Sequence, residues 1–206
     1  MTFTEKVIST ITVAATAVAM ATSVTVMAAE PNWFVTASVG QSSAKAQKPN
    51  VAEVDTVSWD DSDTSYSLGG GYHYADFDFI LSYEQLGEAS ASYTGEVIDS
   101  ELFHQALVNS APKLVDGISL QGRYTLWQSK AFNVKVGVGL LAWELDYTSQ
   151  LNESIIKVDE SDTNLFYNLQ VGYKLTKHVE VSLQATRYTL SVNDVDNIDV
   201  GITYYF

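Results

Sequence analysis

The chain of 206 residues contains no cysteine, so no disulfide bond can stabilise its fold. It has only three prolines, and it shows no proline-rich linker, low-complexity tract or repeat of solenoid period. Basic residues are also scarce, with 11 lysines and arginines against 25 acidic residues and a net charge of −14. Binding to nucleic-acid phosphates requires lysine and arginine. These absences exclude a disulfide-rich scaffold, a repeat protein and a nucleic-acid-binding protein.

Charge is absent altogether from Val7 to Ala29. This run ends in small residues at Val26–Ala28, the kind of site that a signal peptidase reads. We interpret residues 1–28 as a secretory signal peptide, with Ala29 as an alternative last residue, and residues 29–206 as one mature domain. The alternative is a retained transmembrane helix, because the run is long enough to span a bilayer. No lysine or arginine cluster follows to stop transfer, which favours cleavage and export.

The mature part alternates between apolar and polar residues at period two, which is typical of β-strands with one apolar face. The end of the chain is the clearest example, because Ile198, Val200, Ile202, Tyr204 and Phe206 share one face. The eight segments that alternate in this way are residues 32–42, 63–72, 77–87, 117–128, 132–145, 164–175, 178–188 and 197–206.

The connections between these segments alternate in length. Tight turns are predicted within HYA, WQSKA and LTKH, and long acidic loops around residues 43–62, 87–115 and 148–161. Only the last connection on the long-loop side, SVNDV at 191–195, is short. A soluble sandwich also alternates, but tight turns at one end and long loops at the other are typical of an outer-membrane barrel. The sequence predicts an all-β fold, an eight-stranded antiparallel up-and-down transmembrane β-barrel with both termini at the periplasmic end.

Aromatic residues of the apolar face gather towards the strand ends. They predict two interfacial girdles, where a ring with a polar tip is favourable. The girdle at the tight-turn end is expected to contain Trp33, Tyr72, Tyr74, Phe77, Phe132, Tyr173, Tyr204 and Phe206. The second girdle, nearer the long loops, is expected to contain Tyr66, Tyr83, Tyr124 and Tyr167.

The opposite face is small and polar and carries charges of both signs. These charges are Asp78, Glu84, Arg123, Lys135, Lys174, Glu180 and Asp199. An eight-stranded barrel has room inside for side chains and little else, and buried charges require partners. We interpret the set as an ionic plug and not as the lining of a pore. Arg123 and Glu84, on successive strands, are expected to pair, provided that they lie at similar depth.

These features resemble the OmpA/OmpX-type eight-stranded outer-membrane β-barrel family, and more narrowly the outer membrane protein β-barrel domain group of Gram-negative bacteria. The resemblance covers the whole mature chain and rests on the signal, the strands NWFVTASVG and LGGGY, the GRYTLW and GVGLLAWEL pair, and the aromatic end. It implies that Ile202, Tyr204 and Phe206 are the signal read by the barrel-assembly machinery. It also implies contact with outer-membrane lipid and lipopolysaccharide. No OmpA-type peptidoglycan-binding domain is recognised, so no cell-wall tether is expected, and we expect a monomer.

Catalytic chemistry has few candidates. Some eight-stranded barrels modify lipid A with a histidine and a serine near the outer rim. Here His73 and His178 fall in predicted tight turns, and only His104 lies on the outer side, with no serine or acid tied to it by spacing. We therefore expect no enzyme and no cofactor. The glycines of SLGGGY lack the following residues of a phosphate loop, so we expect them to make room for bulky neighbours inside the barrel.

Two stretches of the long loops depart from simple alternation. Residues 100–112 show a helical apolar stripe after Ser100, which favours a short helix over the barrel mouth, with an irregular loop as the alternative. The acidic clusters WDDSD at 59–63 and VDESD at 158–162 could hold divalent cations that bridge to lipopolysaccharide. Solvated charge is the favoured interpretation, so no metal site is predicted.

Two functions remain open. The first is a structural or surface-interaction protein whose loops contact lipopolysaccharide, host surfaces or other cells. The second is a narrow channel. The occluding charges and the small strand number favour the first.

Overall fold

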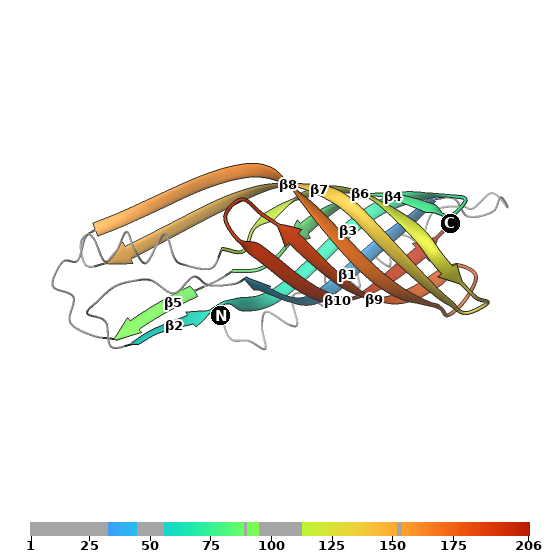
Figure 1. Ribbon diagram of the computed structural model, residues 1–206, viewed down its shortest axis with the longest axis horizontal. Helices are drawn as coiled ribbons and strands as arrows, with labels where there is room; N and C mark the ends of the chain where they lie inside the picture. The colour runs from blue at the N-terminus through green and yellow to red at the C-terminus, as the bar shows by residue number, and fades with distance from the viewer. Residues whose placement is uncertain (1–32, 45–55, 89, 95–112, 152–153) are drawn as a thin grey trace.

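The computed structural model describes residues 33–44, 56–88, 90–94, 113–151 and 154–206. Within these residues the chain forms ten strands: β1 (Trp33–Ala44), β2 (Thr56–Asp60), β3 (Ser62–Tyr74), β4 (Phe77–Gln85), β5 (Ser90–Thr94), β6 (Asp116–Gln128), β7 (Phe132–Leu151), β8 (Ser154–Lys174), β9 (Val179–Thr189) and β10 (Asp194–Tyr205). Eight of them close into one antiparallel barrel in the order β1-β10-β9-β8-β7-β6-β4-β3 (Figure 1). The predicted eight-stranded barrel is confirmed.

The barrel closes because the last strand pairs with the first. The register runs from Phe34 opposite Tyr205 to Ala44 opposite Val195. The backbone N–H of Phe206 then donates to the carbonyl of Trp33 at 3.0 Å. Hydrocarbon offers backbone groups no water, so each must be paired within the protein. This requirement explains why the alternation continues to Phe206.

The two ends of the barrel differ as predicted. The short connections at residues 75–76, 129–131 and 175–178 lie at the same end as the start of β1 and the end of β10. At the opposite end the chain extends well beyond the barrel (Figure 1). The short β9–β10 connection at that end is also confirmed.

The prediction of a loop at residues 148–161 is wrong. β7 and β8 stay paired to Leu151 opposite Ser154, although β6 pairs with β7 only up to Glu144. Residues 148–161 therefore belong to a long two-stranded hairpin that extends beyond the adjacent strands. Another pair, β2 with β5, joins two of the predicted long loops into a separate small sheet. The helix predicted at 100–112 lies outside the described residues.

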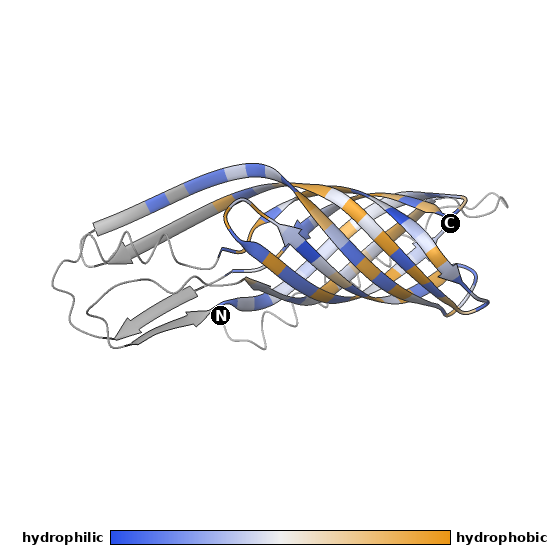
Figure 2. Ribbon diagram, viewed as in Figure 1, coloured by the Kyte–Doolittle hydropathy of each residue, from blue (hydrophilic) through white to orange (hydrophobic). Residues whose placement is uncertain are grey.

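The outer face of the barrel is an apolar belt between two rims. Figure 2 shows apolar and polar residues alternating along the strands. Leu120 and Val200 are examples of the outward side chains, with 60% and 59% of their surfaces exposed. Along β10 and the residue after it, outward apolar side chains run from Ile198 to Phe206, nine residues, and a membrane-spanning strand needs about 9–11. No helix in the described part of the chain is long and apolar enough to cross a membrane.

One aromatic residue was assigned to the wrong rim. Tyr124 was expected in the upper girdle, but the register places it opposite Phe77, directly after a tight turn. The two ring centroids are 5.0 Å apart. Tyr124 thus belongs to the girdle at the tight-turn end, because the register between β4 and β6 sets its height along the barrel.

Glycines inside the barrel make room for large side chains, as predicted for SLGGGY. A Cβ atom on Gly71 would collide with the ring of Phe34, which is buried in the lumen. A Cβ atom on Gly139 would lie 2.5 Å from the ring of Phe166. Both positions need glycine because the narrow lumen leaves no other space for these rings.

Candidate functional site

Six of the seven charges predicted for the barrel interior are buried within it, and the seventh, Lys174, is partly exposed at the end of β8. The buried six are Asp78, Glu84, Arg123, Lys135, Glu180 and Asp199. Alternation therefore predicted the face of each charge. The depth and the partners of each charge follow from the register and the packing.

The tight-turn half of the lumen holds a connected ion cluster. The Nζ atom of Lys135 lies 2.8 Å from Oδ2 of Asp78 and 3.8 Å from Oε1 of Glu180. The Nδ1 atom of His73 lies 2.5 Å from Oδ1 of Asp78. The His73 side chain is 34% exposed, whereas Asp78, Lys135 and Glu180 are almost fully buried. Mutual pairing offsets the cost of removing these charges from water.

Amide side chains extend this cluster towards the middle of the barrel. Glu180 accepts hydrogen bonds from Asn133 Nδ2 at 2.7 Å and from Gln170 Nε2 at 3.3 Å. Arg123 donates from Nε to Gln121 Oε1 at 3.1 Å and from Nη1 to Gln170 Oε1. Gln170 thus links the carboxylate of Glu180 to the guanidinium of Arg123.

The predicted ion pair between Arg123 and Glu84 does not form. The register places Arg123 opposite Asp78, six residues before Glu84 on β4. Glu84 instead accepts hydrogen bonds from the hydroxyl groups of Ser82 at 2.8 Å and Ser119 at 2.9 Å. The assumption of similar depth was wrong, because alternation fixes the face of a residue and leaves its height undetermined.

A small polar cavity lies between these groups. It measures about 20 Å³ and is lined in part by Glu84, Arg123 and Asp199. Asp199 accepts a hydrogen bond from Asn197 Nδ2 at 3.0 Å, and Asn197 accepts one from Ser65 at 2.6 Å. A cavity of this size has room for about one or two water molecules. Side chains therefore fill this part of the lumen.

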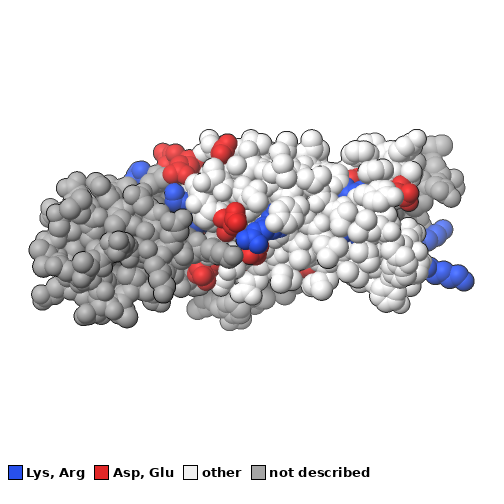
Figure 3. Space-filling model, viewed as in Figure 1, with Lys and Arg blue, Asp and Glu red and all other residues white. Residues whose placement is uncertain are grey.

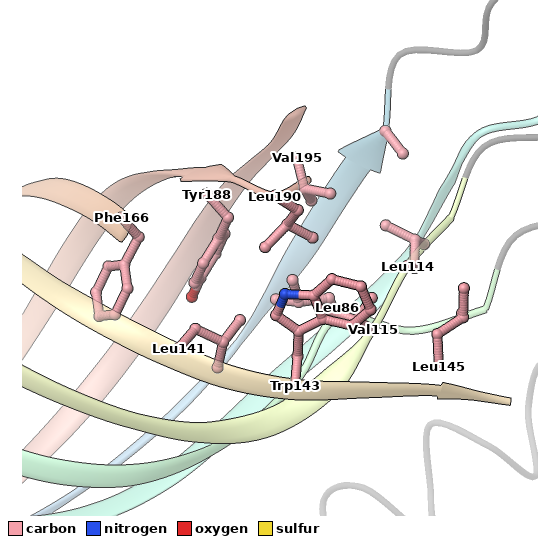
Figure 4. Packing of buried hydrophobic residues seen from close by; sticks show 11 residues of the cluster. Leu86, Leu114, Val115, Leu141, Trp143, Leu145, Phe166, Tyr188, Leu190 and Val195 are labelled. Carbon is pink, nitrogen blue, oxygen red and sulfur yellow. The ribbon is translucent and has the colours of Figure 1, made fainter. Parts of the chain in front are cut away.

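The outer end of the lumen is closed by apolar side chains. Figure 4 shows strands and loop ends from around the barrel contributing to this apolar closure. It consists of Ala44, Leu86, Leu114, Val115, Leu141, Trp143, Leu145, Phe166, Tyr188, Leu190 and Val195. The rings of Phe166 and Tyr188 lie 5.2 Å apart, and Trp143 Nε1 donates to Asn164 at 2.7 Å. The predicted small and polar inner face is therefore wrong for this part of the barrel.

Beyond the apolar closure, the β7–β8 hairpin carries acidic side chains. Asp159 and Asp162 are exposed, and Glu160 forms a 3.3 Å ion pair with Lys113. The backbone N–H of Thr163 donates to Asp162 at 2.7 Å and holds the pKa of that carboxyl below its ordinary value. The hairpin therefore presents an acidic surface.

Charges also mark the upper rim of the barrel itself, over β9 and β10 (Figure 3). Arg187 lies 3.2 Å from Asp194 and 3.5 Å from Asp196. In the predicted acidic cluster at 59–63, Asp63 accepts hydrogen bonds from the backbone N–H groups of Thr64 and Glu88. Among the described residues, no three acidic or histidine side chains gather as metal ligands would.

Comparison with known proteins agrees with this architecture. The family model described as the outer membrane protein beta-barrel domain matches residues 13–206. The chain belongs to this family. It is therefore an outer-membrane β-barrel protein of the Gram-negative type.

Solved structures show the same fold. Neisserial surface protein A is 14% identical, with a TM-score of 0.56, and the match covers 84% of this chain and 97% of that one. The N-terminal β-barrel domain of Pseudomonas aeruginosa OprF is 13% identical, with a TM-score of 0.52 and coverages of 85% and 98%. The attachment invasion locus protein Ail of Yersinia pestis is 13% identical, with a TM-score of 0.52 and coverages of 86% and 100%. No curated protein matches the chain.

In this outer-membrane barrel, the residues of the predicted assembly signal lie at the closing seam. Ile202 is 37% exposed on the outer face, and the rings of Tyr204 and Phe206 lie 5.4 Å apart. His178 Nδ1 lies 2.9 Å from the carbonyl oxygen of Tyr205, to which it can donate. Recognition of this end by the barrel-assembly machinery stays a prediction.

The histidines occupy different environments. His178 lies in the β8–β9 turn, as predicted. His73 was expected in a turn, but it belongs to β3 and its ring contacts the carboxylate of Asp78. His104, which was the candidate closest to the outer rim, lies outside the described residues.

Proposed function

We propose that this outer-membrane protein interacts with other surfaces through its acidic outer end, with the barrel as a rigid anchor. The observation that carries the proposal is the β7–β8 hairpin, which continues beyond the strands on either side of it. β9 begins to pair with β8 at Phe166, so residues 154–165 of β8 have β7 as their only strand partner in the described chain. At about 3.4 Å per residue, that free edge measures about 40 Å.

A protruding hairpin of this kind suits contact better than transport. Its exposed charges repel a second acidic copy and attract cationic groups on another surface. Host-cell or bacterial surface components and lipopolysaccharide with its bound cations are therefore the partners that we propose. Export through the signal peptide at residues 1–28 remains part of this proposal.

The interior supports this role over a channel. The lumen combines an ion cluster, a cavity of about 20 Å³ and an apolar closure, in that order from the tight turns outward. Ions would have to displace both the paired charges and the apolar side chains. A non-enzymatic role fits the same arrangement, since the buried carboxylates are bonded to neighbouring side chains and lie beneath the closure.

The test is a hairpin-shortened variant. Residues 147–158 are replaced by Asn-Gly, which joins Asp146 to its cross-strand partner Asp159 in a two-residue turn. Cells that display equal amounts of the full-length and shortened proteins are compared for adhesion to epithelial monolayers and for cell–cell aggregation. We expect both to fall in the shortened variant, while heat-modifiable gel mobility shows an intact barrel.

Two further measurements separate the alternatives. Sensitivity of the cells to detergent reports on an envelope-stabilising role, and conductance in planar bilayers reports on a channel. Unchanged adhesion and aggregation with an intact barrel would reject a surface interaction through this hairpin. Steady conductance of the full-length protein would favour the channel.

A further inference from the structure

An apolar groove runs across the outside of the barrel from the start of β7 over β8 and β9 to β10. It has a volume of about 250 Å³, and its apolar walls are Phe132, Val171, Tyr173, Val181, Leu183 and Val200. Its floor includes Gly172 and Ser182, which face each other across β8 and β9. Because Gly172 has no side chain and the side chain of Ser182 points into the lumen, bare backbone forms the bottom of the groove.

The register explains the shape of the groove. One row of outward side chains runs from Phe132 through Tyr173 to Val181, and a second runs from Val171 through Leu183 to Val200. The groove lies between these rows, so it crosses the strands. Membrane strands tilt by about 45°, so a groove perpendicular to them is also inclined to the membrane normal. An extended acyl chain can follow this direction.

The groove opens near two lysine-bearing turns. Phe132 and Tyr173 lie at its tight-turn side, with their ring centroids 4.8 Å apart. The adjoining turns carry the exposed residues Lys130 and Lys177. A backbone hydrogen bond of 2.7 Å from Lys174 to Ala131 holds the ends of these turns side by side.

The charge at this position is opposite to that of the chain as a whole. Net charge is −14, yet the two turns beside the groove carry lysine and no acidic residue. Asp76, in the turn between β3 and β4, is the exposed acidic side chain described at this end. Asp78 and Glu180 are enclosed in the lumen. Figure 3 shows cationic side chains projecting from the same end.

We propose that this groove and its lysines bind one anionic glycerophospholipid of the periplasmic leaflet. The acyl chain lies between the two apolar rows, and the phosphate and any further headgroup anion lie by Lys130 and Lys177. The groove belongs to the apolar belt, so lipid is the partner that its surroundings supply. Lysines at the membrane surface favour anionic over zwitterionic headgroups. This inference does not depend on the function proposed for the outer end.

Native mass spectrometry of the folded protein tests the proposal. The protein is released from micelles that contain equal amounts of phosphatidylglycerol and phosphatidylethanolamine with identical acyl chains. We expect one phosphatidylglycerol molecule to be retained preferentially. The double variant Lys130→Gln/Lys177→Gln should lower this preference about fivefold for each lysine removed. The control Lys157→Gln, on the outer hairpin, should leave it unchanged.

A groove-filling variant tests the acyl-chain half of the site. Val181→Trp should reduce retention of both lipids, whereas Val138→Trp, on the outer face of β7 and outside the groove, should not. Heat-modifiable gel mobility confirms that each variant is folded. Equal retention of the two lipids by the wild type, or an unchanged preference in the double lysine variant, overturns the proposal. A dimer that only Val181→Trp disrupts also overturns it, because a second copy would then occupy the groove.

Discussion

The two halves of the lumen are closed by different chemistry. The tight-turn half holds the charged and amide side chains, with Lys135 between Asp78 and Glu180, and it also buries the apolar Phe34 and Ile80. The outer half is filled by apolar groups such as Leu141, Trp143 and Phe166. Both halves occupy the inner face of the same strands, and β7 contributes to both. The interior of one membrane barrel can therefore be largely polar in one half and apolar, like the core of a soluble protein, in the other.

The physical reason lies in what each half must accomplish. Charges inside a narrow barrel are stable only when each has a partner, so the polar half depends on register and is sensitive to the loss of one member. The apolar half depends on volume and excludes water. It also holds loop ends, since Leu86, Leu114 and Leu190 lie just outside the strands. The two halves should therefore respond differently to substitution.

Removing the central cation should have the largest effect. We expect Lys135→Met to lower the free energy of unfolding by about 3–5 kcal/mol, because Asp78 and Glu180 lose their shared partner. Equilibrium unfolding of the barrel in detergent measures this change. Lys174→Met, at the partly exposed end of β8, is the matched control and should change little. An equal loss of unfolding free energy in the two variants would show that the buried ion cluster contributes no more to stability than an exposed lysine does.

Truncation in the apolar closure should cost slightly less. Leu141 is fully buried, and Leu141→Ala should lower the free energy of unfolding by about 2–4 kcal/mol through lost burial and a cavity. The variant should also expose the loop ends to protease before the barrel itself is cut. The control Leu140→Ala changes the preceding residue, which is 50% exposed on the lipid-facing side. If the loops of Leu141→Ala resisted protease as well as those of the wild type, the apolar closure would not be what anchors them.

A glycine inside the polar half tests how tightly it is packed. A Cβ atom on Gly137 would lie 2.5 Å from Asn168 Oδ1 and 2.9 Å from Arg123 Cγ. Gly137→Ala should therefore lower the free energy of unfolding by about 1–3 kcal/mol. At Gly122 a Cβ atom meets nothing within 4 Å, so Gly122→Ala should be close to neutral. Thermal unfolding in the same detergent compares the two, and identical midpoints would contradict the packing argument.

The smallest effect concerns coupling between Arg123 and Glu84. Double-mutant cycles compare Arg123→Met with Glu84→Gln, and Lys135→Met with Asp78→Asn. We expect a clearly smaller coupling energy for the first pair, since Arg123 is bonded to Gln121 and Gln170 and Glu84 to serines. A coupling energy as large as that of the second pair would mean that Arg123 and Glu84 interact directly across the central cavity.

Much of the barrel could be predicted from the sequence. Strict alternation from residues 32–42 to 197–206 specified the strands, their inward and outward faces and the closure of the sheet, because a strand has period two and hydrocarbon tolerates no open edge. The same pattern placed seven charges on the inner face, and the structure buries six of them. It also distinguished the tight-turn end from the end with long connections.

Tertiary structure decided what period two leaves open. Height along the barrel depends on the register between neighbouring strands, which placed Arg123 opposite Asp78 and Tyr124 opposite Phe77. The sequence did not predict the apolar closure, because Leu141 and Leu145 continue the inner face without any change of spacing that marks the end of the membrane. The paired strands at 148–161 were also hidden, since a hairpin that stands in water needs no continuous apolar face. The sequence by itself determined which way each side chain points, and the packing of eight strands determined which side chains meet.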